Sequence, residues 1–325
     1  MAPKPIEVEV CGRQVSVSNP DKVFFSARGE TKIDLVNYYL AVGECVVDGV
    51  RGRPTVLKRY PDGAEGEFFF QKRVPERRPP WLRTAKVRFP SGRYADELCP
   101  MDLAHVVWAV NLGAIGLDPW PVRESDLDRP DELRIDLDPQ PGVPFAQVRS
   151  VAAAVNEVLS EMGITGWPKT SGSRGIHIYV PIEPPAGFED VRSSALALGR
   201  ELERRMPDVV TTAWWKRERG EKVFVDYNQN ARDRTVASAY SVRATPDARV
   251  SFPLRWNEVD DVEPDQFNIS TVPALVSRHG DAWEGMESRR FDLAPLLELA
   301  QRDRAEGIPD APLPPRFRKP AFPRP

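Results

Sequence analysis

The stretch ELRIDLDPQPG, residues 132–142, predicts a short β-strand that ends in two aspartates and is followed at once by a turn. Side chains alternate across a strand, so Ile135 and Leu137 point to the core, while Asp136 and Asp138 share the other face about 7 Å apart at the backbone. Such a carboxylate pair can bridge one or two divalent ions. A solvent-facing strand end whose acids prevent edge pairing explains the pattern about equally well.

Length and composition indicate a globular protein with a substantial core. The 325 residues are enough for one large or two modest domains, and the 41% hydrophobic and 29% charged content is ordinary for a soluble chain. No apolar run approaches the roughly 20 residues of a membrane span, and the N-terminus lacks the apolar core of a signal peptide. We therefore expect no membrane association. Three histidines exclude a His-rich metal site.

Positive charge is concentrated in one segment, although the net charge of the chain is −3. Residues 72–93 carry eight Lys or Arg and one Glu, whereas acidic residues gather in residues 257–266. The overall balance argues against a histone-like polycation, but a basic segment of this kind is compatible with nucleic-acid binding.

The remaining patterns predict an α+β fold with mixed sheets. Thr31, followed three residues later by Asp34, resembles an N-terminal capping box. Strands without the strict βαβ rhythm alternate with helices, and a hairpin is expected between the last two helices. The predicted helices cover residues 31–50, 101–115, 145–162 and 188–206, the predicted strands 53–60 and 67–72, and two apolar runs 222–227 and 235–242. We expect one domain over residues 1–305 and a proline-rich tail over residues 306–325.

A third acid follows the apolar run Lys-Val-Phe-Val at residues 222–225. Asp226 lies at the end of this run, where an unpaired carboxylate is costly unless something compensates it. A third carboxylate would favour a metal site built with Asp136 and Asp138. Capping of the turn at residues 228–230 is the alternative explanation for Asp226.

The segment TSGSRGIHIYV, residues 170–180, combines a small glycine-containing turn with a strand. Alternation places His177 and Tyr179 on the face opposite the three aliphatic side chains. Backbone N–H groups of the turn, the Ser171 hydroxyl and Arg174 can surround an anion. An ordinary hairpin turn is the alternative, and a single histidine is more often structural than catalytic.

Basic and aromatic side chains flank these segments. Alternation places Phe69 on one face and Phe68 and Phe70 on the other, and an exposed ring beside basic groups can stack on a base. Arginine suits bidentate phosphate contacts. Core packing of the phenylalanines and a solvated surface for the cations are the alternatives. The cations around the Asp226 strand are Arg219, Lys222, Arg232, Arg234 and Arg243.

Taken together, eight segments in consistent order resemble the polymerase domain of bacterial ligase D, within the archaeo-eukaryotic primase superfamily. The resemblance runs from about residue 18 to 300 and implies an archaeo-eukaryotic primase-like catalytic core, with mixed and antiparallel sheets flanked by helices. The resembling segments are SNPDKVFF, KRYPDG, FFFQK, WAVNLGAIGLDPWPVR, RIDLDP, TSGSRGIHIYVP, KVFVDYNQN and AYSVRA.

The resemblance also implies roles for individual residues. Asp136, Asp138 and Asp226 correspond to metal-binding catalytic acids, with His177 beside them. The residues that correspond to contacts with the incoming nucleotide are Lys58, Ser171, Arg174, His177, Arg219, Gln229 and Arg243. Those that correspond to DNA contacts are Lys22 and Lys32, for a 5′-phosphate, and Phe69 and Phe70, for stacking at the template bend.

The implied activity is template-dependent nucleotidyl transfer that fills short gaps or extends broken DNA ends, with a preference for ribonucleotides and two Mn²⁺ or Mg²⁺ ions. The implied partners are gapped or broken DNA with a 5′-phosphate, NTP or dNTP, and a separate DNA ligase or end-binding repair protein. The implied location is cytoplasmic and associated with the nucleoid. No K-x-D-G ligase motif occurs, so we expect a stand-alone polymerase.

Two positions depart from the family pattern. Asp118 stands where relatives often have a histidine, and an acid cannot donate to a triphosphate as histidine does. Arg174 stands where relatives often have lysine, which keeps the charge but changes its geometry.

Three other functions are compatible with parts of the pattern. A primase would start chains without a primer. A non-catalytic DNA-end binder would not need the three acids, which are all present. A metal-dependent phosphohydrolase would act without a template and would not need the phosphate-anchoring lysines.

Overall fold

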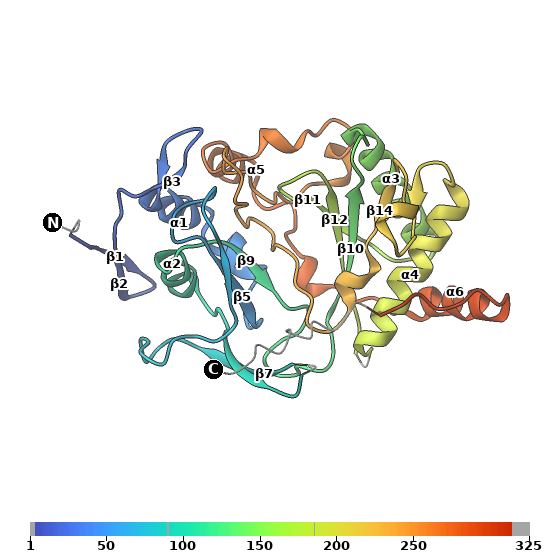
Figure 1. The fold of residues 1–325 in the computed structure, drawn as a ribbon, viewed down its shortest axis with the longest axis horizontal. Helices are drawn as coiled ribbons and strands as arrows, with labels where there is room; N and C mark the ends of the chain where they lie inside the picture. Colours follow the sequence, from blue (N-terminus) through green and yellow to red (C-terminus); the bar gives the residue numbers. More distant parts are fainter. Residues whose placement is uncertain (1–3, 90, 185, 314–325) are drawn as a thin grey trace, which may run out of the picture.

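The computed structural model describes residues 4–89, 91–184 and 186–313. Two sheets lie side by side near the middle of the molecule, each with helices on its outer side (Figure 1). Residues 55–119 build one sheet, the N-terminal sheet, and residues 132–225 build the other, the C-terminal sheet. This arrangement confirms the α+β prediction, and it places residues from both sheets along one boundary.

The C-terminal sheet contains the strand of residues 132–139. Its strand order is β11-β12-β10-β14-β13, and every pairing is antiparallel except that of β13 with β14. The apolar side of β10 is buried against helix α4, because Leu137 pairs with Val225 and Val225 contacts Gly199 of that helix. The strands are β10 (Glu132–Pro139), β11 (Trp167–Thr170), β12 (Ile176–Pro181), β13 (Val210–Thr211) and β14 (Val223–Val225).

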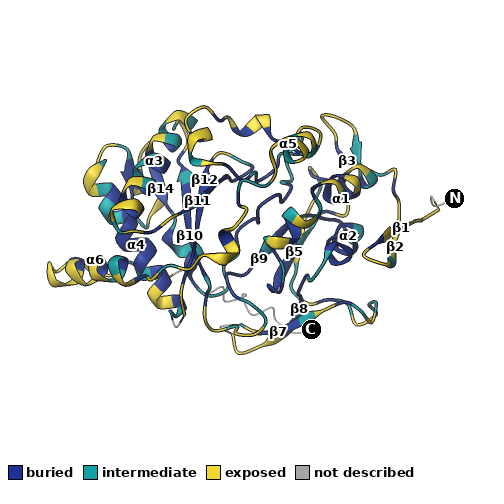
Figure 2. Cartoon of the chain, turned by 180° about the vertical axis from the view of Figure 1, so that it is seen from behind, coloured by how far each residue is buried: buried dark blue, intermediate teal, exposed yellow. Residues whose placement is uncertain are grey.

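Three helices cover the outer side of this sheet. Helices α3 (Phe145–Glu161) and α4 (Phe188–Arg205) pack against it, and α6 (Ala294–Ala305) lies along α4. Their outward faces are exposed, whereas β10, β11 and β12 are largely buried (Figure 2). The buried side chains between these helices and the sheet belong to one hydrophobic core, which also contains buried residues between Val10 and Leu117.

The N-terminal sheet has the order β6-β5-β8-β7, with β9 also paired to β5. Helices α1 (Lys32–Asp48) and α2 (Leu103–Asn111) pack on each other beside it. Two short hairpins precede it, β1 (Ile6–Val10) with β2 (Arg13–Val17) and β3 (Val23–Phe25) with β4 (Glu30–Thr31), and the short helix α5 (Val272–His279) contacts α1. The strands of the sheet are β5 (Thr55–Arg59), β6 (Phe69–Gln71), β7 (Thr84–Arg88), β8 (Tyr94–Leu98) and β9 (Ala114–Pro119).

Most predicted elements are confirmed, with one clear error. The Thr31 cap is present, since its backbone N–H and its hydroxyl both donate to the Asp34 carboxylate, at 2.8 and 2.7 Å. The helix predicted over 101–115 is wrong at its end, because α2 ends at Asn111 and residues 114–119 form β9. Gly113 adopts a φ of 87°, a left-handed conformation that breaks the helix and favours glycine.

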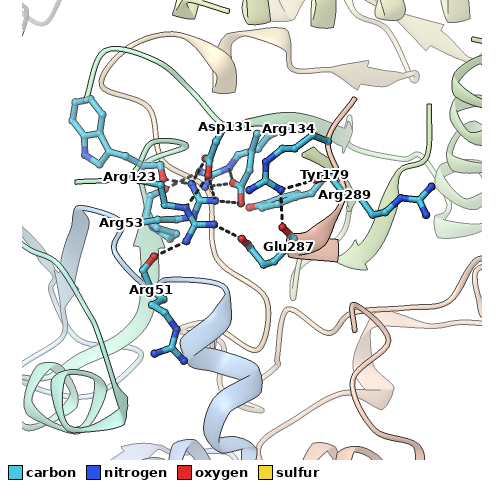
Figure 3. Close-up of polar contacts among 12 residues, drawn as sticks. Arg51, Arg53, Arg123, Asp131, Arg134, Tyr179, Glu287 and Arg289 are labelled. Carbon is cyan, nitrogen blue, oxygen red and sulfur yellow. Dashed lines mark hydrogen bonds and ion pairs between the residues drawn. The ribbon is translucent and has the colours of Figure 1, made fainter. Parts of the chain in front are cut away.

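Buried ion pairs join the two sheets at the beginning of β10. Arg53, just before β5, lies 2.5 Å from Asp131 and 2.6 Å from Glu132. Arg123 reaches the same Asp131 carboxylate at 2.7 Å (Figure 3). We call Arg53, Arg123, Asp131, Glu132 and Arg134 the paired charge network.

Arg134 connects this network to the end of β9. Its guanidinium lies 2.7 Å from Glu132 and donates to the carbonyl oxygens of Pro119 and Trp120, at 2.7 and 3.2 Å. Because Arg134 is 1% exposed, these bonds replace water and fix the spacing between β9 and β10. The two sheets are therefore held together two residues before the first aspartate of interest.

Only part of the proline-rich tail lies within the described residues. Its beginning packs on α4, where Arg192 donates to the carbonyl oxygens of Ala311 and Pro312 at 2.9 and 2.7 Å. Residues 314–325 lie outside the part that the structure describes. Among the described residues, no helix has the length and apolar character needed to cross a bilayer.

Candidate active site

Three carboxylates meet at the end of β10. Asp136 and Asp138 lie on the face of β10 opposite its apolar side chains, as the sequence predicts. Asp226 follows β14, and its backbone N–H donates to the carbonyl oxygen of Asp136 at 2.8 Å. The Asp136 side chain is only 16% exposed. The strand pairing thus brings together acids that are 90 residues apart in the chain.

All three acids are harder to ionise than ordinary aspartates. Burial raises the pKa of Asp136 to about 6, although Lys169 and Arg243 act in the opposite direction. Burial first, and then repulsion by Asp136, raises the pKa of Asp226 to about 6 and raises the pKa of Asp138. A bound divalent cation would counteract both causes of the raised pKa values. It would neutralise the repulsion between the aspartates and replace the hydration that burial removes.

The donor set fits divalent ions, although it is not gathered around one position. Within residues 4–89, 91–184 and 186–313, no three His, Cys, Asp or Glu side chains lie close enough together to hold a metal. Three of the oxygens instead have protein neighbours. One Asp226 oxygen accepts the Asn228 backbone N–H at 3.1 Å, so the predicted alternative of turn capping is confirmed. Gln229 donates to Asp226 at 3.0 Å, and His177 Nε2 lies 3.4 Å from an Asp136 oxygen. Hard carboxylate oxygens are the ligands that Mg²⁺ and Mn²⁺ prefer, so Asp136, Asp138 and Asp226 are the residues that would hold them.

His177 and a lysine that we did not single out from the sequence adjoin the acids. His177 pairs with Asp136 across the β10–β12 register, which confirms the predicted face. Lys169 on β11 is fully buried, and its Nζ lies 2.8 Å from His177 Nδ1. The one signal in the sequence was a lysine within a short buried strand, where an unpaired ammonium is costly.

Further cations approach from the other sheet. Asp118 on β9 pairs with Val56 of β5, and its pKa is raised by burial but lowered in turn by Arg243 and Lys58. Lys58 itself lies 3.8 Å from the centre of the Phe68 ring. The departure at Asp118 therefore places a carboxyl group among the cations, where a donor was expected from the family pattern.

The turn between β11 and β12 is organised by Ser171. Its hydroxyl oxygen accepts the backbone N–H groups of Ser173 and Gly175, at 3.1 and 3.0 Å. Gly175 is required here, because a Cβ would lie 2.3 Å from the Leu137 carbonyl oxygen. Arg174 is exposed at the tip and acts on the charge of Asp138. The turn therefore lies directly beside β10.

Arg219 lies on the other side of the acids. It stacks 3.4 Å above the Phe224 ring and donates to the carbonyl oxygens of Ala213 and Trp214, both at 3.1 Å. Its charge also interacts with Asp138 and Asp226. Four of the predicted nucleotide contacts, Ser171, Arg174, Arg219 and Gln229, thus surround the carboxylates.

Lys22 and Lys32 form a separate basic site near β3 and α1. Lys22 donates to the Pro61 carbonyl oxygen at 2.6 Å and pairs with Asp62 at 2.8 Å. Lys32 donates to the Ser18 and Asn111 carbonyl oxygens, at 2.8 and 3.1 Å. Burial, followed by repulsion from Lys22 and then Arg59, lowers the pKa of Lys32. Two ammonium groups that repel each other are suited to share an anion.

The three phenylalanines form an exposed aromatic surface on β6. Phe69 and Phe70 are 46% and 60% exposed, and the Arg59 guanidinium lies 5.1 Å from the centre of the Phe69 ring. Phe68 and Phe70 contact each other on the opposite face, where Lys58 lies. The predicted alternation is confirmed, and the core-packing alternative is wrong for all three rings.

Comparison with known proteins agrees with this geometry. Residues 31–283 match the family model described as LigD, primase-polymerase domain. The multifunctional non-homologous end joining DNA repair protein LigD of Mycobacterium tuberculosis is 33% identical over 291 residues, which cover 85% of this chain and 37% of that protein. LigD of Pseudomonas aeruginosa is 31% identical over 80% of this chain and 31% of its own length. The chain thus spans about a third of these relatives.

A solved structure is similar over nearly its whole length. The polymerase domain from Mycobacterium tuberculosis ligase D in complex with DNA matches with a TM-score of 0.79 and 31% identity, over 85% of this chain and 99% of that one. The fold is therefore that of the archaeo-eukaryotic primases, as the sequence predicts. The chain belongs to the LigD primase-polymerase domain family, and it is a nucleotidyltransferase of the DNA-directed polymerase and primase type.

Proposed function

We propose that the protein adds nucleotides to the 3′ end of DNA at short gaps and broken ends, using the opposite strand as template. The observation that carries this proposal is the group of three acids with raised pKa values at the boundary between two sheets, faced by Arg219 and Arg243. Such a site combines positions for cations with donors for a polyanionic substrate. An end-binding protein without catalysis would have no use for the three partly buried acids.

The reaction is attack of the primer 3′-hydroxyl on the α-phosphorus of a nucleoside triphosphate, with release of pyrophosphate. Two divalent ions held by Asp136, Asp138 and Asp226 would lower the pKa of the attacking hydroxyl and neutralise the triphosphate. Arg219 and Arg243 orient the phosphates, and Arg174, exposed at the tip of the Ser171 turn, adds a third cation. Donors that are fixed before the reaction stabilise the charge that develops in the transition state.

The DNA contacts follow from two surfaces away from the three aspartates, the basic site of Lys22 and Lys32 and the aromatic surface of β6. Lys22 and Lys32 would hold a 5′-phosphate on the downstream side of a gap, because two repelling ammonium groups gain from a shared dianion. Exposed Phe69 and Phe70 would stack on template bases, with a gain of roughly 1–3 kcal/mol per base. The DNA complex of the similar Mycobacterium tuberculosis domain supports DNA as the ligand class.

The biological setting is end joining, in which a DNA ligase seals the product. The names of the LigD relatives support this assignment, since they are described as non-homologous end joining proteins. Preference for ribonucleotides and for Mn²⁺ completes the proposal and rests on the family resemblance. A cytoplasmic, nucleoid-associated location follows from the DNA substrate.

The test is primer extension on a duplex with a short gap, with either a 5′-phosphate or a 5′-hydroxyl downstream. Each NTP and dNTP is offered singly with Mn²⁺ or Mg²⁺. We expect templated addition that is greatest with a ribonucleotide, Mn²⁺ and the 5′-phosphate, and that is abolished in the Asp136→Ala/Asp138→Ala variant. Arg278→Ala, at the end of α5, is a control that should keep full activity.

Three results would contradict the proposal. Tight binding to the gap without addition under any metal would make the protein an end-binding factor. Equal chain synthesis on a single-stranded template without a primer would make it a primase. Phosphate release without templated addition would indicate a phosphohydrolase.

A further inference from the structure

A chain of hydrogen bonds runs through the interior and ends at His177. Lys169 and His177 are partners in the antiparallel pairing of β11 with β12. The Lys169 Nζ lies 2.8 Å from His177 Nδ1 and also contacts the Ser251 hydroxyl. Lys169 is fully buried, so no water competes for these bonds. This series of hydrogen bonds has a defined direction, because each group in it donates to the next or accepts from it.

The direction is set at the end far from the acids. The Ser251 hydroxyl donates to the carbonyl oxygen of Thr170 at 2.7 Å. A carbonyl oxygen only accepts, and a hydroxyl carries a single hydrogen. The Ser251 oxygen therefore has only its lone pairs left for Lys169, so the lysine must be the donor.

The same direction continues to the imidazole. An ammonium has only donors, so His177 Nδ1 must accept from it. Burial lowers the pKa of Lys169 well below its ordinary value, and a neutral amine still has two N–H bonds, one for Ser251 and one for His177. The lone pair of a neutral amine would accept from Nδ1–H only if Nε2 carried a lone pair, which would then face the Asp136 carboxylate. At the other end of the ring, Nε2 faces an Asp136 oxygen at 3.4 Å, where a hydrogen is favoured over a lone pair.

We propose that Lys169 is a positioning residue that holds His177 in the tautomer with its hydrogen on Nε2. The ring then directs an N–H donor toward the carboxylates, where it is available to a phosphate oxygen of the incoming nucleotide. This role rests on the proposed nucleotidyl transfer. Without Lys169, Nδ1 could carry the hydrogen, and the ring would present a lone pair to an anionic substrate.

A second histidine of the protein, His105, has the opposite tautomer and serves as an internal reference. His105 Nε2 accepts the backbone N–H of Arg83 at 3.1 Å, and its Nδ1 lies 2.8 Å from an Asp102 oxygen. These partners place the hydrogen on Nδ1. With only three histidines in the sequence, the signals of His105, His177 and His279 are readily assigned from single substitutions.

The test is the tautomer of each histidine, measured by long-range ¹H–¹⁵N NMR on the metal-free full chain. We expect the Nε2–H form for His177 and the Nδ1–H form for His105. In Lys169→Met, which keeps a long unbranched side chain without a buried amine, His177 should become a mixture of tautomers while His105 stays unchanged. Lys222→Met is the matched control, because the Lys222 amine contacts only the Pro207 carbonyl oxygen among described polar groups and the residue is only partly buried.

Kinetics provides a second readout. Lys169→Met should lower kcat/KM for the nucleotide by roughly 10- to 100-fold, the effect typical of a residue that orients another. In a His177→Ala background the same substitution should have little further effect, since the two residues act as one unit.

Several results would overturn the inference. A native His177 with its hydrogen on Nδ1 would do so, as would an unchanged tautomer in Lys169→Met or additive kinetic losses. A native Nε2–H tautomer that depends on Lys169, in a protein without nucleotidyl transfer, would uphold the tautomer assignment and contradict the proposed function instead.

Discussion

The two ends of β10 hold buried charge in opposite ways. At the beginning of the strand, Glu132 lies between Arg53 and Arg134, at 2.6 and 2.7 Å. At its end, Asp136 and Asp138 share one face with no ion pair to Lys or Arg among the described residues. A neutralised cluster at Glu132 and an anionic one at Asp136 thus lie only four positions apart on one strand.

Their pKa values differ accordingly. In the paired charge network, burial disfavours the Asp131 anion, but Arg53 and Arg123 outweigh burial and hold the pKa of Asp131 well below its usual range. Among the three aspartates, burial is the dominant effect and raises the pKa of Asp136 to about 6. Burial alone therefore does not identify a functional site. The informative feature is burial that no protein cation fully compensates.

The largest expected effect is on catalysis. Replacing Asp136 by Asn removes a carboxylate that the proposed reaction requires, with little change in side-chain volume. Templated addition should fall by roughly 10⁴-fold or more, about 5.5 kcal/mol of transition-state stabilisation. Single-turnover primer extension measures the loss, and a fall of less than about tenfold would exclude Asp136 from the reacting centre.

The opposite end of the strand should matter for stability. Glu132→Ala leaves the Arg53 and Arg134 guanidinium groups without a carboxylate between them, and breaking a buried pair costs about 3–5 kcal/mol. Urea unfolding measures this free energy. The control is Glu287→Ala, because Glu287 is a 49% exposed partner of Arg123 and should contribute less than about 1 kcal/mol. Equal losses would show that the network does not differ from surface pairs.

At the other end of β10, removing the charge of Asp136 should stabilise the metal-free protein, the reverse of the effect of Glu132→Ala. Because the pKa of Asp136 is raised to about 6, the folded state holds a proton that the unfolded state releases between about pH 4 and 6. Stability is therefore lost as the pH rises through this window. Asp136→Asn should stabilise the metal-free protein at pH 7 by about 1–3 kcal/mol.

The pH dependence separates this cause from a general effect of the substitution. Below about pH 4 both the folded and the unfolded Asp136 are protonated, so the stabilisation by Asp136→Asn should disappear there. Thermal unfolding of both proteins between pH 3.5 and 7.5 measures the difference. A variant that is less stable than the native protein at pH 7 would contradict the account.

The smallest expected effect concerns Lys22. This lysine is 37% exposed in its pair with Asp62, so Lys22→Ala should change the free energy of unfolding by less than about 1 kcal/mol. It should nevertheless reduce the preference for a 5′-phosphate over a 5′-hydroxyl several-fold in gap binding. Fluorescence anisotropy with the two DNAs measures the preference. An unchanged ratio would place the phosphate elsewhere.

Local patterns were predictable from the sequence, and distant pairings were not. Alternation in residues 135–138 identified the apolar and acidic faces of β10, and the Thr31 cap identified the start of α1. The end of α2 was missed because the apolar pattern continues from the helix into β9, and only the conformation of Gly113 separates them.

The paired charge network and the role of Lys169 could not be predicted for a different reason. Arg53 and Glu132 are 79 residues apart, and their contact depends on how two sheets meet. Lys169 lies eight residues from His177, but only the β11–β12 register places them opposite each other. The predicted site residues came from local patterns and family resemblance, whereas the groups that orient and enclose them are set by tertiary structure.

The central claim is that Asp136, Asp138 and Asp226 form a binding site for divalent cations. The most direct measurement is equilibrium Mn²⁺ binding, followed by the EPR signal of the free ion, for the native protein and for Asp136→Asn/Asp138→Asn. The account predicts saturable binding by the native protein that the double variant loses while it remains folded. Equal binding by both proteins, or no binding by the native protein with DNA and nucleotide present, would contradict it.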